Sequence, residues 1–235
     1  MQHLPARTGA DVHLAEAFGL PGCPLCREQA RTQAAHISSI LDESVNDVPF
    51  RQRLDAGGGF CGIHARAVLA ADRRGSGGLG AAILLRATLV SRLRDLDAAQ
   101  EAMALTRRRR MREAARPAAC PICARLAAAD DIVVAGLVRL AEHPAWAAAA
   151  AGAPFCLAHV TRLMDRRSVP AWWGPVEARQ LERLRDLRDR LDGFAHTASA
   201  DRRHLRTDPQ RQALGEVADL LGGGVPDEAV ERSRW

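Results

Sequence analysis

Residues 120–123 read Cys-Pro-Ile-Cys, and residues 23–26 carry almost the same letters, Cys-Pro-Leu-Cys. A Cys-x-x-His follows each of them, and the offset between the copies is 97 for the first two cysteines and 95 for the third cysteine and the histidine. The aligned positions are Cys23, Cys26, Cys61 and His64 in the first copy, and Cys120, Cys123, Cys156 and His159 in the second. All six cysteines of the chain fall in this pattern. The sequence therefore contains one motif used twice, with a two-residue deletion in the second copy.

Each copy predicts a helical hairpin. Residues 23–46 and 120–142 carry apolar side chains at three- and four-residue steps, which is typical of an amphipathic helix. A proline-started turn and glycines at 57–59, or Gly-Ala-Pro at 152–154, then break the chain before the Cys-x-x-His. A second helix is expected from that point, over 61–71 in the first copy.

The rest of the chain also predicts helices, over about 79–111, 175–194 and 208–221, and shows no convincing alternating strand. Aromatic residues are only 4% of the chain, and its apolar residues are mostly Ala, Leu and Val, which favours helices over strands. We expect an all-α fold: two pseudo-symmetric helical hairpins in one compact unit. The expected segments are an N-terminal segment 1–20, the repeats 21–78 and 117–168, a linking helix 79–116 between them, and a C-terminal helical extension 169–235.

The cysteines of the two Cys-Pro-x-Cys motifs are expected at helix starts. Proline is favourable at the first position of a helix, so Pro24 and Pro121 would lie just inside two helices. Backbone N–H groups and the helix dipole stabilise thiolates there. In each Cys-x-x-His the three-residue spacing puts both side chains on one helix face.

Three thiolates and one imidazole form the closed tetrahedral set of structural zinc. We therefore predict two zinc ions, with the ligands pairing within each copy because a hairpin brings its two helix starts together. A crossed arrangement, in which Cys23 and Cys26 meet Cys156 and His159, stays open.

Three other interpretations of these residues remain. Three Cys and one His can hold an iron–sulfur cluster such as [4Fe-4S], and Cys followed by Pro is common beside such clusters. Cys-Pro-x-Cys is also the sequence pattern of dithiol redox motifs, but those folds place strands near the motif and no convincing strand is expected in this chain. Small buried core cysteines are the plainest alternative, although they do not explain the repeated histidine.

The composition limits the kinds of partner and the cellular location that are expected for the chain. The formal net charge is +5 and every basic residue is Arg, a usage typical of GC-biased codons, so the positive charge is weak evidence for nucleic acid and no nucleic-acid partner is expected. No stretch predicts a leader peptide or a membrane span, which makes a cytoplasmic protein with reduced thiols the expectation. Arg107–Arg110 is interpreted as a solvated run, Trp172-Trp173 as an anchor of the last helices, and 194–204 as an irregular connection rather than a catalytic or second metal site.

The paired motif resembles a family of uncharacterised bacterial proteins, a domain of unknown function, whose members carry Cys-Pro-x-Cys and Gly-Phe-Cys-x-x-His twice. The likeness spans about 20–222, and the segments that carry it are Cys23-Pro24-Leu25-Cys26, Val45-Asn46-Asp47, Gly59-Phe60-Cys61-Gly62-Ile63-His64, Cys120-Pro121-Ile122-Cys123 and Phe155-Cys156-Leu157-Ala158-His159. The resemblance implies metal binding and the fold, and it names no substrate.

The most favoured function is a metal-binding protein that uses zinc for structure and presents a helical surface to a protein partner. An iron–sulfur protein in electron transfer or redox sensing is the alternative. An enzyme that uses the thiolates directly forms a third class.

Overall fold

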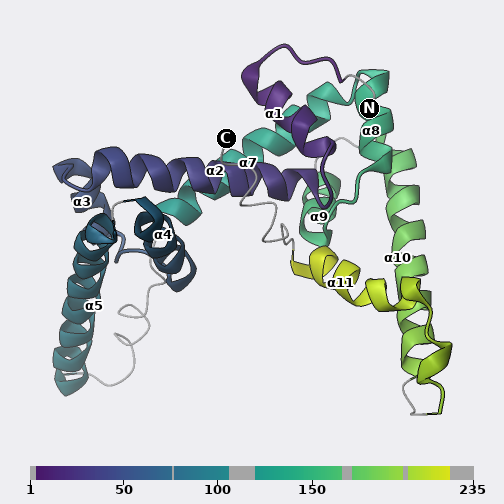
Figure 1. The fold of residues 1–235 in the computed structure, drawn as a ribbon. Helices are drawn as coiled ribbons and strands as arrows, with labels where there is room; N and C mark the ends of the chain where they lie inside the picture. Colours follow the sequence, from purple (N-terminus) through teal and green to yellow (C-terminus); the bar gives the residue numbers. More distant parts are fainter. Residues whose placement is uncertain (1–3, 76, 106–119, 166–170, 198–200, 223–235) are drawn as a thin grey trace. The chain divides into compact units, whose positions relative to one another are not determined.

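The computed structural model describes residues 4–75, 77–105, 120–165, 171–197 and 201–222. Within these ranges every regular element is a helix, and no strand occurs. The predicted all-α class is therefore confirmed (Figure 1).

Each copy of the repeat folds as a long helix, a short helix and a helix that carries the histidine. In the first copy these are α2 (Pro24–Ser39) with a π-helical turn η1 (Ile40–Ser44), α3 (Val48–Ala56) and α4 (Gly62–Gly75). In the second copy they are α7 (Pro121–Leu140), α8 (Pro144–Gly152) and α9 (Leu157–Met164). Both long helices begin at the proline of Cys-Pro-x-Cys, as predicted.

The short helix α3 lies where a turn is expected, and α8 was not predicted. Each has a proline in its first two positions and a capping side chain before it. The Asp47 carboxylate accepts a hydrogen bond from the backbone N–H of Phe50 at 2.8 Å, and Nδ1 of His143 accepts one from Ala145 N–H at 3.2 Å. Proline at a helix start together with a cap predicts a helix as well as a turn, and here the helix forms.

The remaining elements are α1 (Gly9–Phe18), α5 (Leu79–Leu105), α10 (Trp173–His196), a 3₁₀ turn η2 (Arg203–Leu205) and α11 (Asp208–Gly222). The helix α1 was not predicted. Its signal is a capping box: the Thr8 hydroxyl accepts from Asp11 N–H at 3.2 Å, and the Asp11 carboxylate accepts from Thr8 N–H at 2.9 Å.

Contacts group the chain into two compact units, residues 1–31 with 130–235, and residues 32–129. The grouping cuts through both long helices: α2 contributes its first turns to one unit and the rest to the other, and so does α7. The units therefore do not coincide with the two copies of the repeat.

The unit of residues 1–31 and 130–235 has an aromatic core. Trp146 and Phe155 are fully buried, and the Phe18 ring stacks edge-on against both, at centroid distances of 5.5 and 6.2 Å. Trp173 at the start of α10 is buried in this core and Trp172 packs against it, so the predicted anchor of the last helices is confirmed.

The unit of residues 32–129 has an aliphatic core. Leu54 of α3, Val68 of α4 and Leu84 of α5 have no exposed surface, and they cluster with Ile122 at the start of α7. This cluster holds the Cys-x-x-His end of the first copy against the Cys-Pro-x-Cys end of the second.

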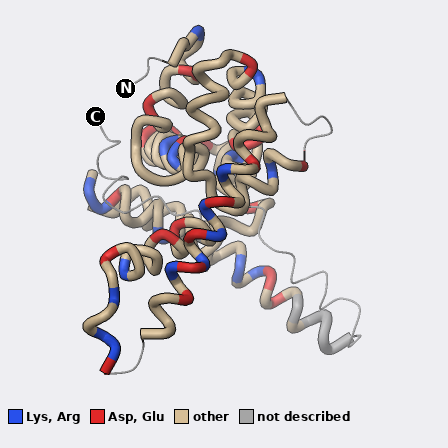
Figure 2. Tube along the Cα trace, turned by 90° about the vertical axis from the view of Figure 1, so that its right-hand side faces the viewer, with Lys and Arg blue, Asp and Glu red and all other residues tan. Residues whose placement is uncertain are grey.

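Acidic and basic positions are interspersed along the described helices (Figure 2). In α10, for example, Arg190 bonds to Asp186 at 2.9 Å and to Glu216 of α11 at 2.7 Å. None of the described helices is long and apolar enough to cross a membrane. The Arg107–Arg110 run lies outside the described residues.

Candidate metal centres

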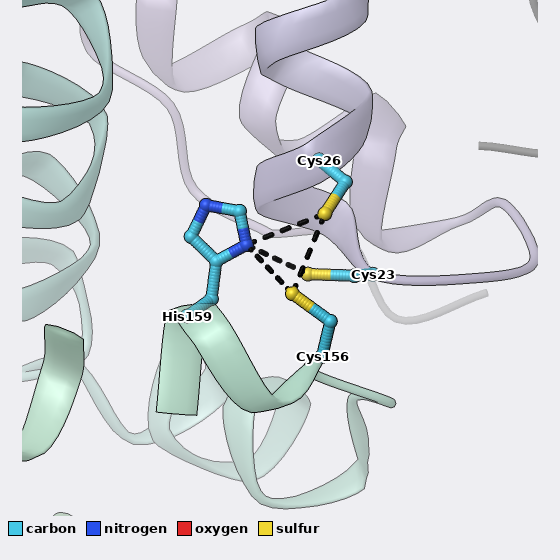
Figure 3. A group of neighbouring side chains, drawn as sticks. All are labelled: Cys23, Cys26, Cys156 and His159. Atoms are coloured by element: carbon cyan, nitrogen blue, oxygen red, sulfur yellow. Dashed lines mark hydrogen bonds between the residues drawn. The ribbon is translucent and has the colours of Figure 1, made fainter. Parts of the chain in front are cut away.

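The first centre, called site I, consists of Cys23, Cys26, Cys156 and His159. The two cysteines at the start of α2 face the Cys-x-x-His at the start of α9, and Nδ1 of the histidine lies among the three sulfurs (Figure 3). Its distances to Sγ of Cys23, Cys26 and Cys156 are 3.5, 3.3 and 3.1 Å. All four side chains are at most 5% exposed, so the site is closed to solvent.

A buried carboxylate supports site I from behind the histidine. Nε2 of His159 lies 3.0 Å from Oδ1 of Asp130, whose side chain is 1% exposed. The other carboxylate oxygen of Asp130 pairs with Arg162. Asp130 therefore accepts a hydrogen bond from Nε2–H, which fixes the ring orientation and leaves Nδ1 free to bind a metal.

The second centre, site II, consists of Cys61, His64, Cys120 and Cys123. Nδ1 of His64 lies 3.2, 3.5 and 3.2 Å from the sulfurs of Cys61, Cys120 and Cys123, and the sulfurs of Cys61 and Cys123 are 3.8 Å apart. Unlike site I, this centre is open on one side, because Cys123 is exposed and Cys61 is half-buried.

A close backbone contact positions Cys61. Gly59 has φ +87°, and a Cβ there would lie 2.4 Å from Cγ2 of Thr88. The Thr88 hydroxyl in turn accepts a hydrogen bond from Phe60 N–H at 3.3 Å. A glycine is therefore required two residues before the cysteine, both for its left-handed backbone and for the close approach of α5.

Gln33 takes the place of the carboxylate at site II. Its Oε1 lies 3.2 Å from Nε2 of His64. Gln33 and Asp130 are both seven residues after the second cysteine of their copy and differ by the repeat offset of 97. Neither residue was predicted, although the repeat offset aligns the two as a polar pair in the long helices.

The predicted pairing of ligands within each copy is wrong. Each site joins the Cys-Pro-x-Cys of one copy to the Cys-x-x-His of the other. The long helix carries the chain away from its own cysteines for 21 residues, roughly 30 Å, whereas the nine-residue α3 rises only about 13 Å. His64 accordingly contacts Gln33, two helical turns past Cys26, rather than Cys23 and Cys26 at the start of α2.

Burial and the hydrogen bonds within each cluster shift the pKa values of its cysteines and histidine. Burial lowers the pKa of His159, but its hydrogen bonds to Asp130 and to the thiols outweigh burial and raise the pKa to about 11. Hydrogen bonds from Cys23 and Cys26 lower the pKa of Cys156. At site II burial lowers the pKa of His64, which favours the neutral imidazole that metals bind. A metal ion entering either site displaces the remaining protons.

Two other features of the described residues contain none of the cluster ligands. A hollow of about 430 Å³ lies between α3 and α5 and contains none of the eight candidate ligands. Its lining consists of Val48, Arg51, Gln52, Asp55, Arg86, Ala87, Val90 and Arg94. In the 194–204 segment, Nδ1–H of His196 donates to the carbonyl of Asp192 at 2.7 Å, and the Arg206 guanidinium stacks on the Phe194 ring.

The described helices and the two clusters define an all-α protein with two Cys3His groups positioned to bind metal. The chain belongs to DUF6062, a family of unknown function, whose profile matches residues 11–170. The match includes all eight cluster residues and ends before α10, whereas the resemblance was expected to continue to residue 222. No curated protein and no solved structure matches the chain.

Proposed function

We propose that each Cys3His group holds one zinc ion as a structural element, and that the zinc-stabilised helices present a surface to a protein partner. The observation that carries the proposal is the convergence of three cysteine sulfurs and one imidazole nitrogen within 4.8 Å of one another, twice, from segments far apart in the sequence. Three thiolates and an imidazole are a donor set typical of structural zinc.

The separations of the ligand atoms favour a single ion. A tetrahedral zinc ion with bonds of about 2.3 Å to sulfur and about 2.0 Å to nitrogen keeps its ligand atoms about 3.5–3.8 Å apart. The separations are 3.1–3.5 Å at site I and 3.2–3.8 Å at site II. The ligands of a four-iron cluster bind different irons and must stand further apart, so the geometry supports one ion over the [4Fe-4S] alternative.

The proposed structural role follows from the completeness of each set. Four protein ligands fill a tetrahedral ion, which leaves no position for a substrate or an activated water. Each ion would tie together the starts of two helices from different copies, α2 with α9 and α4 with α7. Cross-links between such distant segments restrict the unfolded chain most.

The test is the metal content of protein purified without chelators. We expect two zinc equivalents per chain by elemental analysis and no visible absorption from iron. A chain that carries neither zinc nor iron after aerobic and anaerobic purification would contradict metal binding. Iron with sulfide in place of zinc would support the iron–sulfur alternative.

A partner surface is proposed on α5. Leu89, Leu93 and Leu96 follow one another at helical spacing and are 59, 49 and 65% exposed. Exposed apolar side chains that gather on one helix face are typical of interaction sites. Because these side chains are not in the core, replacing Leu89 and Leu93 with Ser should leave the melting temperature of the isolated chain unchanged.

The same double variant should lose the partner that the unaltered chain retains on affinity resin. The buried Leu84 lies on the opposite face of α5, and Leu84→Ala is the matched control that lowers stability instead. Equal retention by the unaltered chain and the double variant would contradict this surface.

A further inference from the structure

Sites I and II have the same ligands but differ in three features of their surroundings. The first is exposure: all four residues of site I are buried, whereas site II exposes Cys123 and half-exposes Cys61. A reagent dissolved in water can therefore reach two sulfurs of site II and none of site I.

The second difference is the group behind the histidine. His159 of site I donates to the Asp130 carboxylate, whereas His64 of site II donates to the neutral amide of Gln33. A carboxylate behind a histidine ligand makes the imidazole a stronger donor, and losing such a partner typically lowers metal affinity about 10–100-fold. Site II is the weaker of the two on this ground.

The third difference is charge. Three thiolates and one divalent ion leave a net charge of −1 at each site. At site I a buried cation, Arg27, lies close enough to Cys23 for their charges to interact. The equivalent residue in the second copy, 97 positions later, is Ala124, which carries no charge. This position therefore supplies no positive charge to the thiolates of site II.

We propose that site II is a thiol-reactive zinc site that releases its ion on oxidation by hydroperoxides, while site I keeps its ion. This inference rests on the zinc proposed above. The reacting pair is Cys123 and Cys61, because these two sulfurs are accessible and only 3.8 Å apart. Cys120 is 1% exposed and is protected.

Hydrogen peroxide oxidises Cys123 and Cys61 in two steps. The Cys123 thiolate attacks one peroxide oxygen; an S–O bond forms, the O–O bond breaks, and the leaving hydroxide takes a proton to become water. The Cys61 thiolate then attacks the Cys123 sulfur; the S–S bond forms and the second hydroxide leaves and is protonated. Two thiolates lose two electrons, peroxide becomes two waters, and zinc, left with Cys120 and His64, is released.

The experiment treats the full zinc-loaded chain with hydrogen peroxide and follows free zinc with a chromogenic chelator, after the zinc content before treatment has been measured. We expect one equivalent to appear at least ten times faster than the second, together with a Cys61–Cys123 disulfide in peptide mass spectra. Reduction with dithiothreitol and added zinc should restore two equivalents. Gln33→Glu, which supplies a carboxylate behind His64, should slow the first release several-fold.

The outcomes separate this inference from the proposed function. If the chain contains two zinc ions but releases both at one rate, or releases neither, the proposal of structural zinc stands and the proposal of a reactive site II is wrong. Unchanged release in Gln33→Glu overturns the contribution of Gln33. If the purified chain contains no zinc, both proposals are wrong.

Discussion

Removal of both ions is expected to lower the melting temperature by about 10–20 °C. The free energy of binding zinc to deprotonated ligands appears as folding free energy, about 10–16 kcal/mol per ion in small zinc domains. A chain of this size has cores besides, so a net loss of about 5 kcal/mol is the expectation, at about 2–4 °C per kcal/mol.

The measurement is thermal melting followed by circular dichroism, before and after chelation, with metal loss confirmed by elemental analysis. Chelation should leave much of the helical signal, because most members of the aromatic core around Trp146 and of the aliphatic core around Leu84 are apolar side chains that bind no metal. Added zinc should restore the original melting curve. An unchanged melting temperature after proven metal loss would rule out a structural role and favour iron–sulfur or thiol chemistry.

The fold class and the eight cluster residues could be predicted because their signals are local or repeated. The amino-acid sequence shows the proline at the start of α2 and α7, the apolar spacing along the helices, and the repeat offset of 97 or 95 residues. The short helices α3 and α8 were missed because Pro49 and Pro144 are compatible with a turn or a helix start. Only the capping contacts of Asp47 and His143 decide between them.

The pairing of the ligands could not be predicted in the same way. A repeat offset states which residues are equivalent, but it does not state which copy a residue contacts. Contact depends on helix lengths. The short α3 returns the chain only as far as Gln33, so His64 lies beside Gln33 and the cysteines of α2 group with His159 instead. Asp130 and Gln33 could not be predicted for a related reason. Nothing in the sequence marks a polar residue of a long helix as the partner of a histidine until the two are known to lie side by side.

The crossed pairing makes an expected result that two double variants can separate. Cys26→Ser with Cys156→Ser removes two ligands of site I and should leave one zinc per chain. Cys26→Ser with Cys61→Ser removes one ligand from each site and should leave none when a chelator strips weakened sites. Pairing within the copies would reverse both results, because Cys26 and Cys61 would then share an ion.

Stability should follow the same logic. Two substitutions in one site remove the same ion, so the second adds little to the first, and their free-energy losses should fall well short of the sum. Substitutions in separate sites remove two ions, and their losses should add within about 0.5 kcal/mol if the sites are independent. The three single and two double variants form two cycles with Cys26→Ser in common, measured by chemical denaturation with zinc present.

The ion that remains in each variant can also be identified directly. Cobalt(II) bound by three thiolates and an imidazole in a tetrahedral site absorbs visible light, so each variant can be titrated with cobalt and its equivalents counted. Cys26→Ser with Cys156→Ser should retain one such band, from site II, and peroxide should abolish it through Cys61 and Cys123. Retention of a band that peroxide does not change would mean that the surviving ion lies in a closed site, contrary to the exposure of Cys123.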